Sequence, residues 1–234
     1  MYLYETHVHS LNGSACGRCT PKELVQAYKK AGYTGFVLTD HFVRGNTSVP
    51  RDLDWETRMN LYYDAYLESK EEGDRLDFDV FFGIEHYYAK GKEILIYGID
   101  LDFLLAHPEL NTAQIEVYAD LVHEVGGILV HAHPHRIRDY IDPNFAPRYD
   151  VSDGIEVYNA GDVDEINELA VRDAIVLNKL MTSGGDVHKV IDEPKIGRAG
   201  VGFKRRLNDT KDFVNALKNG EGQIMFHGEM RKIE

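Results

Sequence analysis

Short apolar runs alternate with longer amphipathic segments along the whole chain. The short runs predict buried strands, and the longer segments carry apolar residues at the spacing of helices. Strands are expected at residues 2–6, 35–39, 79–83, 93–99, 128–130, 154–158, 180–183, 201–204 and 223–226, and helices at residues 21–31, 55–72, 114–125, 164–178 and 211–218. Strands that alternate with helices pair in parallel through right-handed crossovers. The pattern therefore predicts an α/β fold, either a closed barrel or an open doubly wound sheet.

Local signals mark where some of these elements begin and turn. Thr20 is expected to cap the first helix, with Pro21 at its first position and Glu23 completing a capping box. Gly32 stands where a helix-ending glycine belongs. A hairpin is expected to turn at Gly91, between the third and fourth strands.

Composition narrows the class of protein. The 234 residues fit one domain over residues 1–234, and no apolar run approaches the ~20 residues that a membrane-spanning helix needs. The first residues lack the basic and then apolar pattern of a signal peptide, so a cytoplasmic protein without membrane contact is expected. The formal net charge of −13 argues against stable nucleic-acid binding, although bound divalent cations could make one cleft positive.

Cys16 and Cys19 are the only cysteines. They are interpreted first as reduced thiols of a cytoplasmic protein. A redox pair at this spacing stays open because a helix follows, whereas a structural zinc ribbon would need a second cysteine pair. Cys16 as a metal ligand is a further interpretation.

Most of the eleven histidines follow predicted strands. These are His7, His9, His41, His86, His131, His133, His135 and His188, with Glu85 and Asp186 close by, whereas His107, His123 and His227 fall elsewhere. The carboxyl ends of parallel strands open on one face, where active sites lie. Residues spread over nearly the whole chain are therefore expected to meet at one site.

Spacing within pairs supports the same site. His7 with His9, His131 with His133, and Asp186 with His188 are each two residues apart. In extended backbone both side chains of such a pair face one side. Imidazole with carboxylate is a ligand set that suits zinc, iron and manganese. A lone histidine at a strand end is more often structural, but this many converging donors favour a metal site.

Six stretches occur in order along the chain. They are Thr6-His7-Val8-His9-Ser10, Leu38-Thr39-Asp40-His41, Gly83-Ile84-Glu85, Val130-His131-Ala132-His133-Pro134, Gly154-Ile155-Glu156-Val157-Tyr158-Asn159 and Ser183-Gly184-Gly185-Asp186-Val187-His188. Together they resemble the polymerase and histidinol phosphatase (PHP) superfamily, from the amino end to about residue 200. The resemblance implies a distorted seven-stranded (β/α) barrel of the PHP type, with two or three divalent metal ions (Zn, Mn or Fe) at its C-terminal face.

The resemblance also implies a ligand set. A first cation would be held by His7, His9, Glu85 and Asp186, and Glu85 would bridge to a second cation bound by His133. A third cation would take His41 and His188.

The chain departs from the family pattern at two places. Members usually carry a histidine in the strand after the bridging glutamate, and this chain has Leu95 about there. His131 is expected to project to the same side as His133 and could compensate, although a supporting or structural role is equally open. Near the first strand, where members commonly show Asp or His, Cys16 is either a soft ligand that favours zinc or a packing residue.

The function implied is hydrolysis of phosphate esters by a metal-activated hydroxide. Asp186 or His188 is expected to protonate the leaving oxygen. Arg18, Arg136 and Arg198 are candidates for binding the phosphate, and Glu156 and Asn159 are expected either to support the ligands or to contact the substrate. The expected partner is a small phosphorylated molecule or nucleotide, as a monoester or a diester.

Two other functions stay open. A non-catalytic metal-binding module fits the departures at Leu95 and Cys16. An amidohydrolase-like enzyme that cleaves C–N bonds would share the opening His-x-His, but it would normally need a carboxylatable lysine at a strand end, and none is found there.

Overall fold

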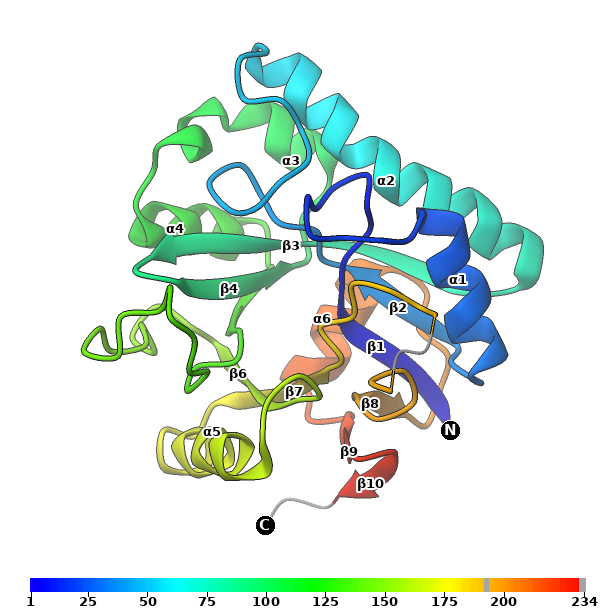
Figure 1. Cartoon of the computed structure of the whole chain (residues 1–234). Coiled ribbons are helices and arrows are strands. Elements are labelled where there is room, and N and C mark those ends of the chain that lie inside the picture. The colour runs from blue at the N-terminus through cyan, green and yellow to red at the C-terminus, as the bar shows by residue number, and fades with distance from the viewer. Residues whose placement is uncertain (192–193, 232–234) are drawn as a thin grey trace.

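The computed structural model describes residues 1–191 and 194–231, which form one ten-stranded sheet with helices around it (Figure 1). The strands are β1 (Tyr2–Val8), β2 (Gly35–Leu38), β3 (Asp79–Ala89), β4 (Lys92–Tyr97), β5 (Ile128–His131), β6 (Gly154–Asn159), β7 (Leu180–Gly184), β8 (Gly200–Phe203), β9 (Gln223–Phe226) and β10 (Glu229–Arg231). The helices are α1 (Pro21–Lys30), α2 (Trp55–Leu76), α3 (Leu101–Ala106), a 3₁₀ turn (Pro108–Asn111), α4 (Ile115–Glu124), α5 (Asp164–Val176) and α6 (Thr210–Lys218).

The sheet curls so that its seventh strand approaches its first. Strands β1, β2 and β3 are parallel, β4 is antiparallel to both of its neighbours, and β5, β6 and β7 are again parallel. Just beyond β7, the amide of Asp186 donates to the carbonyl of His7 at 2.8 Å, and Val187 forms a parallel bridge with Val8. These contacts bring the carboxyl ends of β1 and β7 together.

The expected α/β architecture is confirmed in its coarse form, but the count of seven strands is wrong. Strands β8, β9 and β10 continue the sheet from β1 as antiparallel neighbours, which makes ten strands in the described residues. Strand β10 follows β9 after a turn at His227 and Gly228, and its three residues are too short to leave a clear pattern in the sequence.

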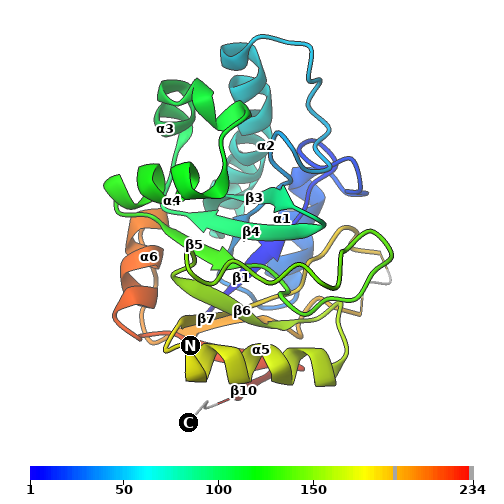
Figure 2. The same ribbon diagram turned by 90° about the vertical axis from the view of Figure 1, so that its left-hand side faces the viewer.

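Helices cover the outside of the curled sheet. Helices α1 and α2 pack together beside β2 and β3, whereas α5 lies along β6 on the opposite side of the molecule (Figures 1 and 2). Tyr4, Val37, Leu95 and Val130 belong to the core shared by the curled sheet, α5 and α6. This packing fixes the strand ends that carry the polar side chains of the site. None of the described helices is both long and apolar enough to cross a membrane.

The predicted hairpin at Gly91 is present, and its first strand is longer than expected. Lys90 and Gly91 both have left-handed backbone, with φ of 52° and 83°, as a tight turn between antiparallel strands requires. Strand β3 continues past Gly83 to Ala89. The polar pair Glu85 and His86 interrupts the apolar run, and this interruption concealed the second half of the strand.

The first helix begins with the predicted capping box. Thr20 Oγ1 accepts a hydrogen bond from the Glu23 amide at 3.2 Å, and Glu23 Oε2 accepts one from the Thr20 amide at 2.8 Å. The helix ends before Gly32, whose φ is 88°. Both helix ends therefore agree with the sequence signals.

Replacing Thr20 by Ala should lower the free energy of unfolding by about 1 kcal/mol, because the amide of Glu23 loses its acceptor. Urea unfolding followed by circular dichroism measures the change. Thr112→Ala is the control, since Thr112 is exposed and no hydrogen bond of its side chain occurs within residues 1–191 and 194–231. An equal loss of stability in both variants would contradict a specific capping effect.

Candidate metal centre

Nitrogen and oxygen donors from six parts of the chain meet at one end of the curled sheet. His7 lies in β1 and His9 just beyond it, His41 follows β2, Glu85 lies in β3, Glu93 is the second residue of β4, His133 follows β5, and Asp186 and His188 follow β7. Six of these residues are buried, and Glu93 and His188 are partly exposed, with 13% and 27% of their side chains accessible. The topology therefore brings together residues that are up to 181 positions apart (188 − 7).

Glu85 is the centre of this cluster. Its Oε1 lies 3.1 Å from His133 Nε2 and 3.2 Å from His7 Nε2. Its Oε2 lies 2.9 Å from His41 Nδ1 and 3.4 Å from His9 Nε2. Each carboxylate oxygen thus faces two imidazoles, which is the arrangement that a bridging ligand needs.

Asp186 closes the other side of the cluster. Its Oδ1 lies 3.4 Å from His9 Nε2, 3.7 Å from His7 Nε2 and 3.5 Å from His188 Nδ1. Burial would raise the pKa of Asp186, but Arg136 and His7 outweigh it and hold this pKa well below its ordinary value. Asp186 is therefore a carboxylate anion that could bind a cation.

The backbone is strained at two of these residues. His133 has φ of 28° and Asp186 has φ of 51°, a left-handed conformation that non-glycine residues seldom adopt. Such strain persists where surrounding contacts enforce it, and it concentrates at functional sites.

Hydrogen bonds to the Nδ1 atoms of His7 and His9 orient the Nε2 atoms of these two rings. His7 Nδ1 lies 2.9 Å from Glu156 Oε1, and His9 Nδ1 lies 3.1 Å from the hydroxyl of Ser14, which donates to Asp40 at 2.7 Å. A carboxylate behind a histidine fixes its tautomer and leaves the other nitrogen as a lone-pair donor. The two Nε2 atoms of His7 and His9 then face each other at 3.0 Å.

These donors fit divalent cations. Among the described residues, four overlapping groups of three donors have their ligand atoms within 4.8 Å of one another: His7, His9 and Glu85; His7, His133 and Asp186; His9, His41 and His188; and His41, Glu85 and Glu93. Buried His41 Nδ1 and Glu85 Oε2 have no hydrogen-bond partner within that part of the chain, although they lie 2.9 Å apart. Burial opposes protonation of His41, but Glu85 outweighs it and raises the pKa of His41 well above its ordinary value, so a proton or a bound cation between the two atoms would stabilise both.

The pKa values of the two central histidines are shifted in opposite directions. Burial opposes protonation of His7, but Glu85, Glu156 and Asp186 outweigh it and raise its pKa well above the ordinary value. Burial, reinforced by His188 and His41, lowers the pKa of His9 well below the ordinary value. Without a cation, the carboxylates therefore favour a proton on His7, and His9 is favoured in its neutral form.

A pocket of about 490 Å³ opens onto the cluster. The cluster residues that line it are His41, Glu85, Glu93, His133, Asp186 and His188, and its walls include Cys16, Arg44, Tyr87, Arg136 and Tyr140. A substrate in this pocket would contact the donors directly.

Glu156 and Asn159 lie behind the donors. Besides His7, Glu156 accepts hydrogen bonds from the His133 amide and from Asn159 Nδ2, both at 2.9 Å. Asn159 Oδ1 in turn accepts from Arg136 Nη2 at 2.8 Å. Both residues are completely buried or nearly so, which fits the expected supporting role better than substrate contact.

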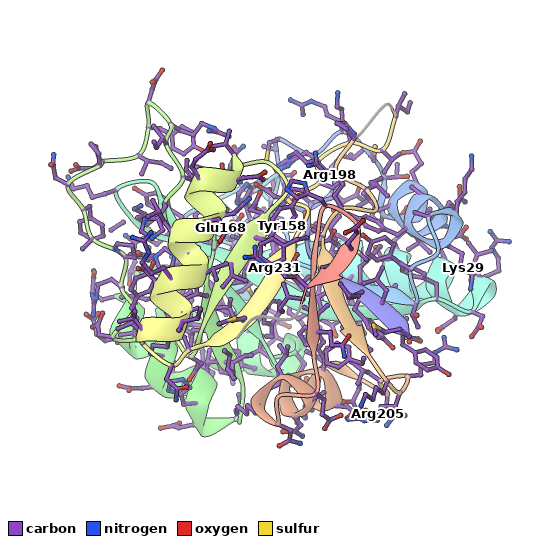
Figure 3. All side chains as sticks on the ribbon, turned by 90° about the horizontal axis from the view of Figure 1, so that it is seen from below. Lys29, Tyr158, Glu168, Arg198, Arg205 and Arg231 are labelled. Atoms are coloured by element: carbon purple, nitrogen blue, oxygen red, sulfur yellow. The ribbon has the colours of Figure 1, made fainter. Side chains whose placement is uncertain are left out.

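The structure separates the three candidate arginines. Arg136 reaches the pocket, but its guanidinium already donates to Asp186 Oδ2 at 2.7 Å and to Asp162. Arg18 is exposed and donates to the carbonyls of its own loop. Arg198 contacts His227 and lies near Tyr158, on the side that carries Arg231 (Figure 3). Arg136 is the candidate among these three that lines the pocket.

The expected orientation of His131 is wrong. His131 ends β5 and pairs with Ile94, and its Nε2 lies 2.7 Å from the Tyr88 hydroxyl, outside the cluster. Burial lowers its pKa to about 3. The backbone leaves the extended conformation before His133, so the two side chains do not share a side.

Two further histidines that were expected at the metal centre also point away from the donor cluster. His86 packs on the Tyr118 ring with centroids 3.9 Å apart, and His135 Nε2 lies 2.7 Å from Asp173 Oδ2. The side chain of His86 is on the opposite face of β3 from that of Glu85, as strand alternation requires. Both therefore stand apart from the donors.

Glu93 is the donor that sequence reasoning missed. Leu95 is fully buried in the core beneath the cluster, and Glu93, two residues earlier on the same face of β4, reaches the pocket. Its Oε1 lies 3.4 Å from His41 Nδ1 and its Oε2 lies 3.7 Å from His133 Nε2. The sequence feature that could have identified Glu93 is a carboxylate at the start of a strand that follows a hairpin turn.

Cys16 lies at the pocket and Cys19 does not. Burial would raise the pKa of the Cys16 thiol, but contacts with His188 and His41 outweigh it and lower this pKa to about 6. The buried Cys19 Sγ accepts a hydrogen bond from the Val190 amide at 3.1 Å. Both thiols are free, so the two cysteines have different surroundings and are not joined.

Sequence comparison then decides the family. A family model described as PHP domain matches residues 5–160, which is two thirds of the chain. The chain belongs to the PHP domain family. This confirms the resemblance seen in the ordered motifs. No curated protein sequence matches this PHP domain significantly.

Solved structures share the fold. A two-domain protein from Bacteroides vulgatus, described as containing a predicted PHP-like metal-dependent phosphoesterase, superposes with a TM-score of 0.72 at 16% identity, covering 98% of this chain and 66% of that one. The lesion-specific endonuclease PfuEndoQ from Pyrococcus furiosus superposes with a TM-score of 0.62 at 13% identity, covering 95% of this chain and 57% of that one. An endonuclease Q bound to a 27-mer duplex with an abasic lesion at the active site gives 0.64 at 12% identity, covering 93% and 56%. This PHP domain thus spans less than two thirds of the length of each.

Proposed function

We propose that this PHP domain hydrolyses phosphate esters with two or three divalent cations held by His7, His9, His41, Glu85, Glu93, His133, Asp186 and His188. The observation that carries the proposal is the position of buried Glu85, whose two oxygens face four imidazoles. Membership of the family and the fold shared with a PHP-like phosphoesterase support it. Divalent cations bound there would lower the pKa of water and neutralise phosphoryl charge.

The residues of the chain divide the remaining work. Glu156 and Ser14 hold His7 and His9 by their Nδ1 atoms, so that their Nε2 atoms stay aimed at Glu85 and Asp186. Arg136 keeps Asp186 anionic, which suits Asp186 to bind a cation rather than to donate a proton. His188, partly exposed at the pocket, either binds a cation or protonates the leaving oxygen.

The substrate proposed is a small phosphorylated molecule or a nucleotide. The pocket volume of about 490 Å³ suits a ligand of that size. The formal net charge of −13 disfavours a long nucleic-acid backbone. Because endonuclease Q binds duplex DNA, a short oligonucleotide belongs among the substrates tested.

Turnover of an aryl phosphate and an aryl phosphodiester tests the proposal. Protein purified without chelator and supplied with Mn²⁺ or Zn²⁺ should hydrolyse these esters and release the phenolate. Excess chelator should abolish this release until metal is restored. Colorimetric rates measure this directly. If metal-loaded protein turned over neither ester, nor nucleotides nor a short oligonucleotide, the phosphoesterase proposal would fail, and a non-catalytic metal-binding module would remain.

A further inference from the structure

The outer face of β4 carries a buried cation that the metal centre does not use. Lys92 and Glu93 are neighbours in this strand, so their side chains leave it on opposite faces. Glu93 lines the pocket at the metal centre, whereas Lys92 lines a second pocket of about 540 Å³. Only 7% of Lys92 is exposed, so its ammonium group is largely shielded from bulk water.

Lys92 has no acidic partner among the described residues. Its Nζ donates a hydrogen bond to the Pro134 carbonyl at 2.6 Å, and it forms no ion pair with any Asp or Glu of residues 1–191 and 194–231. A buried ammonium group without a counter-charge is strongly disfavoured, and one carbonyl offsets only part of this penalty. The position therefore favours the binding of an anion.

The lining of the second pocket combines basic groups with apolar surface. Its charged or titratable residues are Lys92, His135, Arg136, Arg138 and a single acid, Asp139, and the others are apolar except Asn144. Arg136, Arg138 and His135 each pair with an aspartate already. Within the described residues, Lys92 is the basic group of this lining that lacks such a partner. A local excess of basic groups on a chain with a formal net charge of −13 indicates an anionic ligand.

A long loop encloses this pocket and separates it from the metal centre. The loop joins β5 to β6 (residues 132–153) and contains neither helix nor strand (Figure 2). Connections longer than ~12–15 residues are uncommon unless they have a function. Gly91 approaches the loop so closely that an added Cβ would lie 2.7 Å from Ile141 Cα. Gly91 and Tyr140 line the metal pocket, whereas Lys92 and Ile141 line the second pocket, so this contact lies between the two.

We propose that the second pocket binds a small organic anion, with a phosphate or carboxylate head group on Lys92 and an apolar body against Ile141 and Phe145. Lysine binds head groups of either kind as a point charge. A volume of about 540 Å³ lies within the range of small-molecule sites. The site is distinct from the metal centre, and its ligand binds whether or not the protein hydrolyses phosphate esters.

Phenylphosphonate tests the site, because it has an anionic head group, an aromatic body and no ester bond to hydrolyse. The protein, stripped of metal and then freed of chelator, should bind one molecule per chain in isothermal titration calorimetry. Lys92→Met should weaken binding at least about tenfold, as expected when a hydrogen bond to a charged group is lost. Lys90→Met removes an exposed lysine from the turn of the same hairpin and should bind as the wild type.

Three further titrations define the class of ligand. Benzoate replaces the phosphonate by a carboxylate, and Lys92-dependent binding of either anion supports the site and identifies the head group. Benzamide is neutral and should not bind. Phe145→Ala should weaken the binding of phenylphosphonate several-fold and leave that of inorganic phosphate unchanged, since phosphate has no apolar body. Binding of neither anion, equal affinity in wild type and Lys92→Met, or benzamide binding as tight as that of benzoate overturns the proposal.

Thermal unfolding separates a binding role of Lys92 from a structural one. Saturating phenylphosphonate should raise the Tm of the wild type and of Lys90→Met, but not that of Lys92→Met. A lower Tm of Lys92→Met with an undiminished ligand shift would show that Lys92 only supports the loop. Should Lys92→Met fail to fold, Phe145→Ala still decides, because unchanged affinity for phenylphosphonate in that variant contradicts the pocket. These measurements involve neither bound metal nor turnover, so their outcome is independent of the phosphoesterase assay.

Discussion

Replacing Glu85 by Gln should abolish most activity and metal binding together. The glutamine would keep the size of the side chain but lose its negative charge and one of the two acceptor oxygens that face His7, His133, His41 and His9. If Glu85 bridges two cations, kcat/KM should fall by about 10³-fold or more, the size expected when pre-organised electrostatic stabilisation is removed. Steady-state kinetics with metal analysis of the same sample measures both quantities.

The loss at Glu85 has to be separated from general damage to the protein. Glu124→Gln makes the same chemical change on an exposed face of α4 and should leave kcat/KM and metal content unchanged. Circular dichroism should show a folded Glu85→Gln protein, because β3 keeps its backbone pairing to β4. Full metal retention with full activity would show that Glu85 does not bridge cations.

The convergence of the donors could be predicted from sequence because it follows from topology. His7 and Asp186 lie at or just beyond the end of a strand, and Glu85 lies in β3 just after Gly83, where the predicted strand ended; parallel strands deliver such positions to one face. The order of the motifs was sufficient for the family. Neither inference needed the register of any strand pair or the side-chain rotamers.

The sequence missed Glu93 and misplaced His131 because strand register and backbone bending decide where these two side chains point. Glu93 rather than Leu95 reaches the pocket because β4 pairs Glu93 with Tyr87 and Leu95 with Glu85, and a shift along a strand by two residues moves a side chain from the mouth into the core. His131 faces away from His133 because β5 ends there and the chain turns. Spacing of two residues indicates a shared side only while the backbone stays extended.

The supporting residues were partly visible in the sequence. Glu156 and Asn159 were identified as supporting or substrate-contacting residues because they end a strand on the same face, and their hydrogen bonds favour support. Asp40 stood in one of the ordered motifs, but neither it nor Ser14, which together orient His9, was assigned a role, because serine and aspartate are common in loops for many reasons. Their role depends on how the loop between β1 and α1, which carries Ser14, folds against Asp40 beyond β2.

Gly154→Ala is the matched control for a second glycine substitution, Gly184→Ala, which tests sterically how Glu156 supports His7. Gly154 begins β6, and an added Cβ would meet the Leu180 carbonyl and a methyl of Val130 at 3.1 Å. The contact is tight but reaches no residue of the centre, so the variant should lose some stability and keep its metal content and its activity per folded molecule.

Gly184→Ala should impair the centre through its supports rather than its ligands. Gly184 ends β7, where an added Cβ would overlap both Glu156 Oε1 and the Cβ of His7. To relieve this overlap, β1 or β7 must shift, or the hydrogen bond between Glu156 and His7 Nδ1 must break. We therefore expect the free energy of unfolding to fall by about 1–3 kcal/mol and the metal affinity to fall by about 10–100-fold. Urea unfolding and metal titration measure the two effects. Unchanged metal affinity in a destabilised Gly184→Ala protein would mean that the position of His7 does not depend on Glu156, since the overlap leaves no room for the present arrangement.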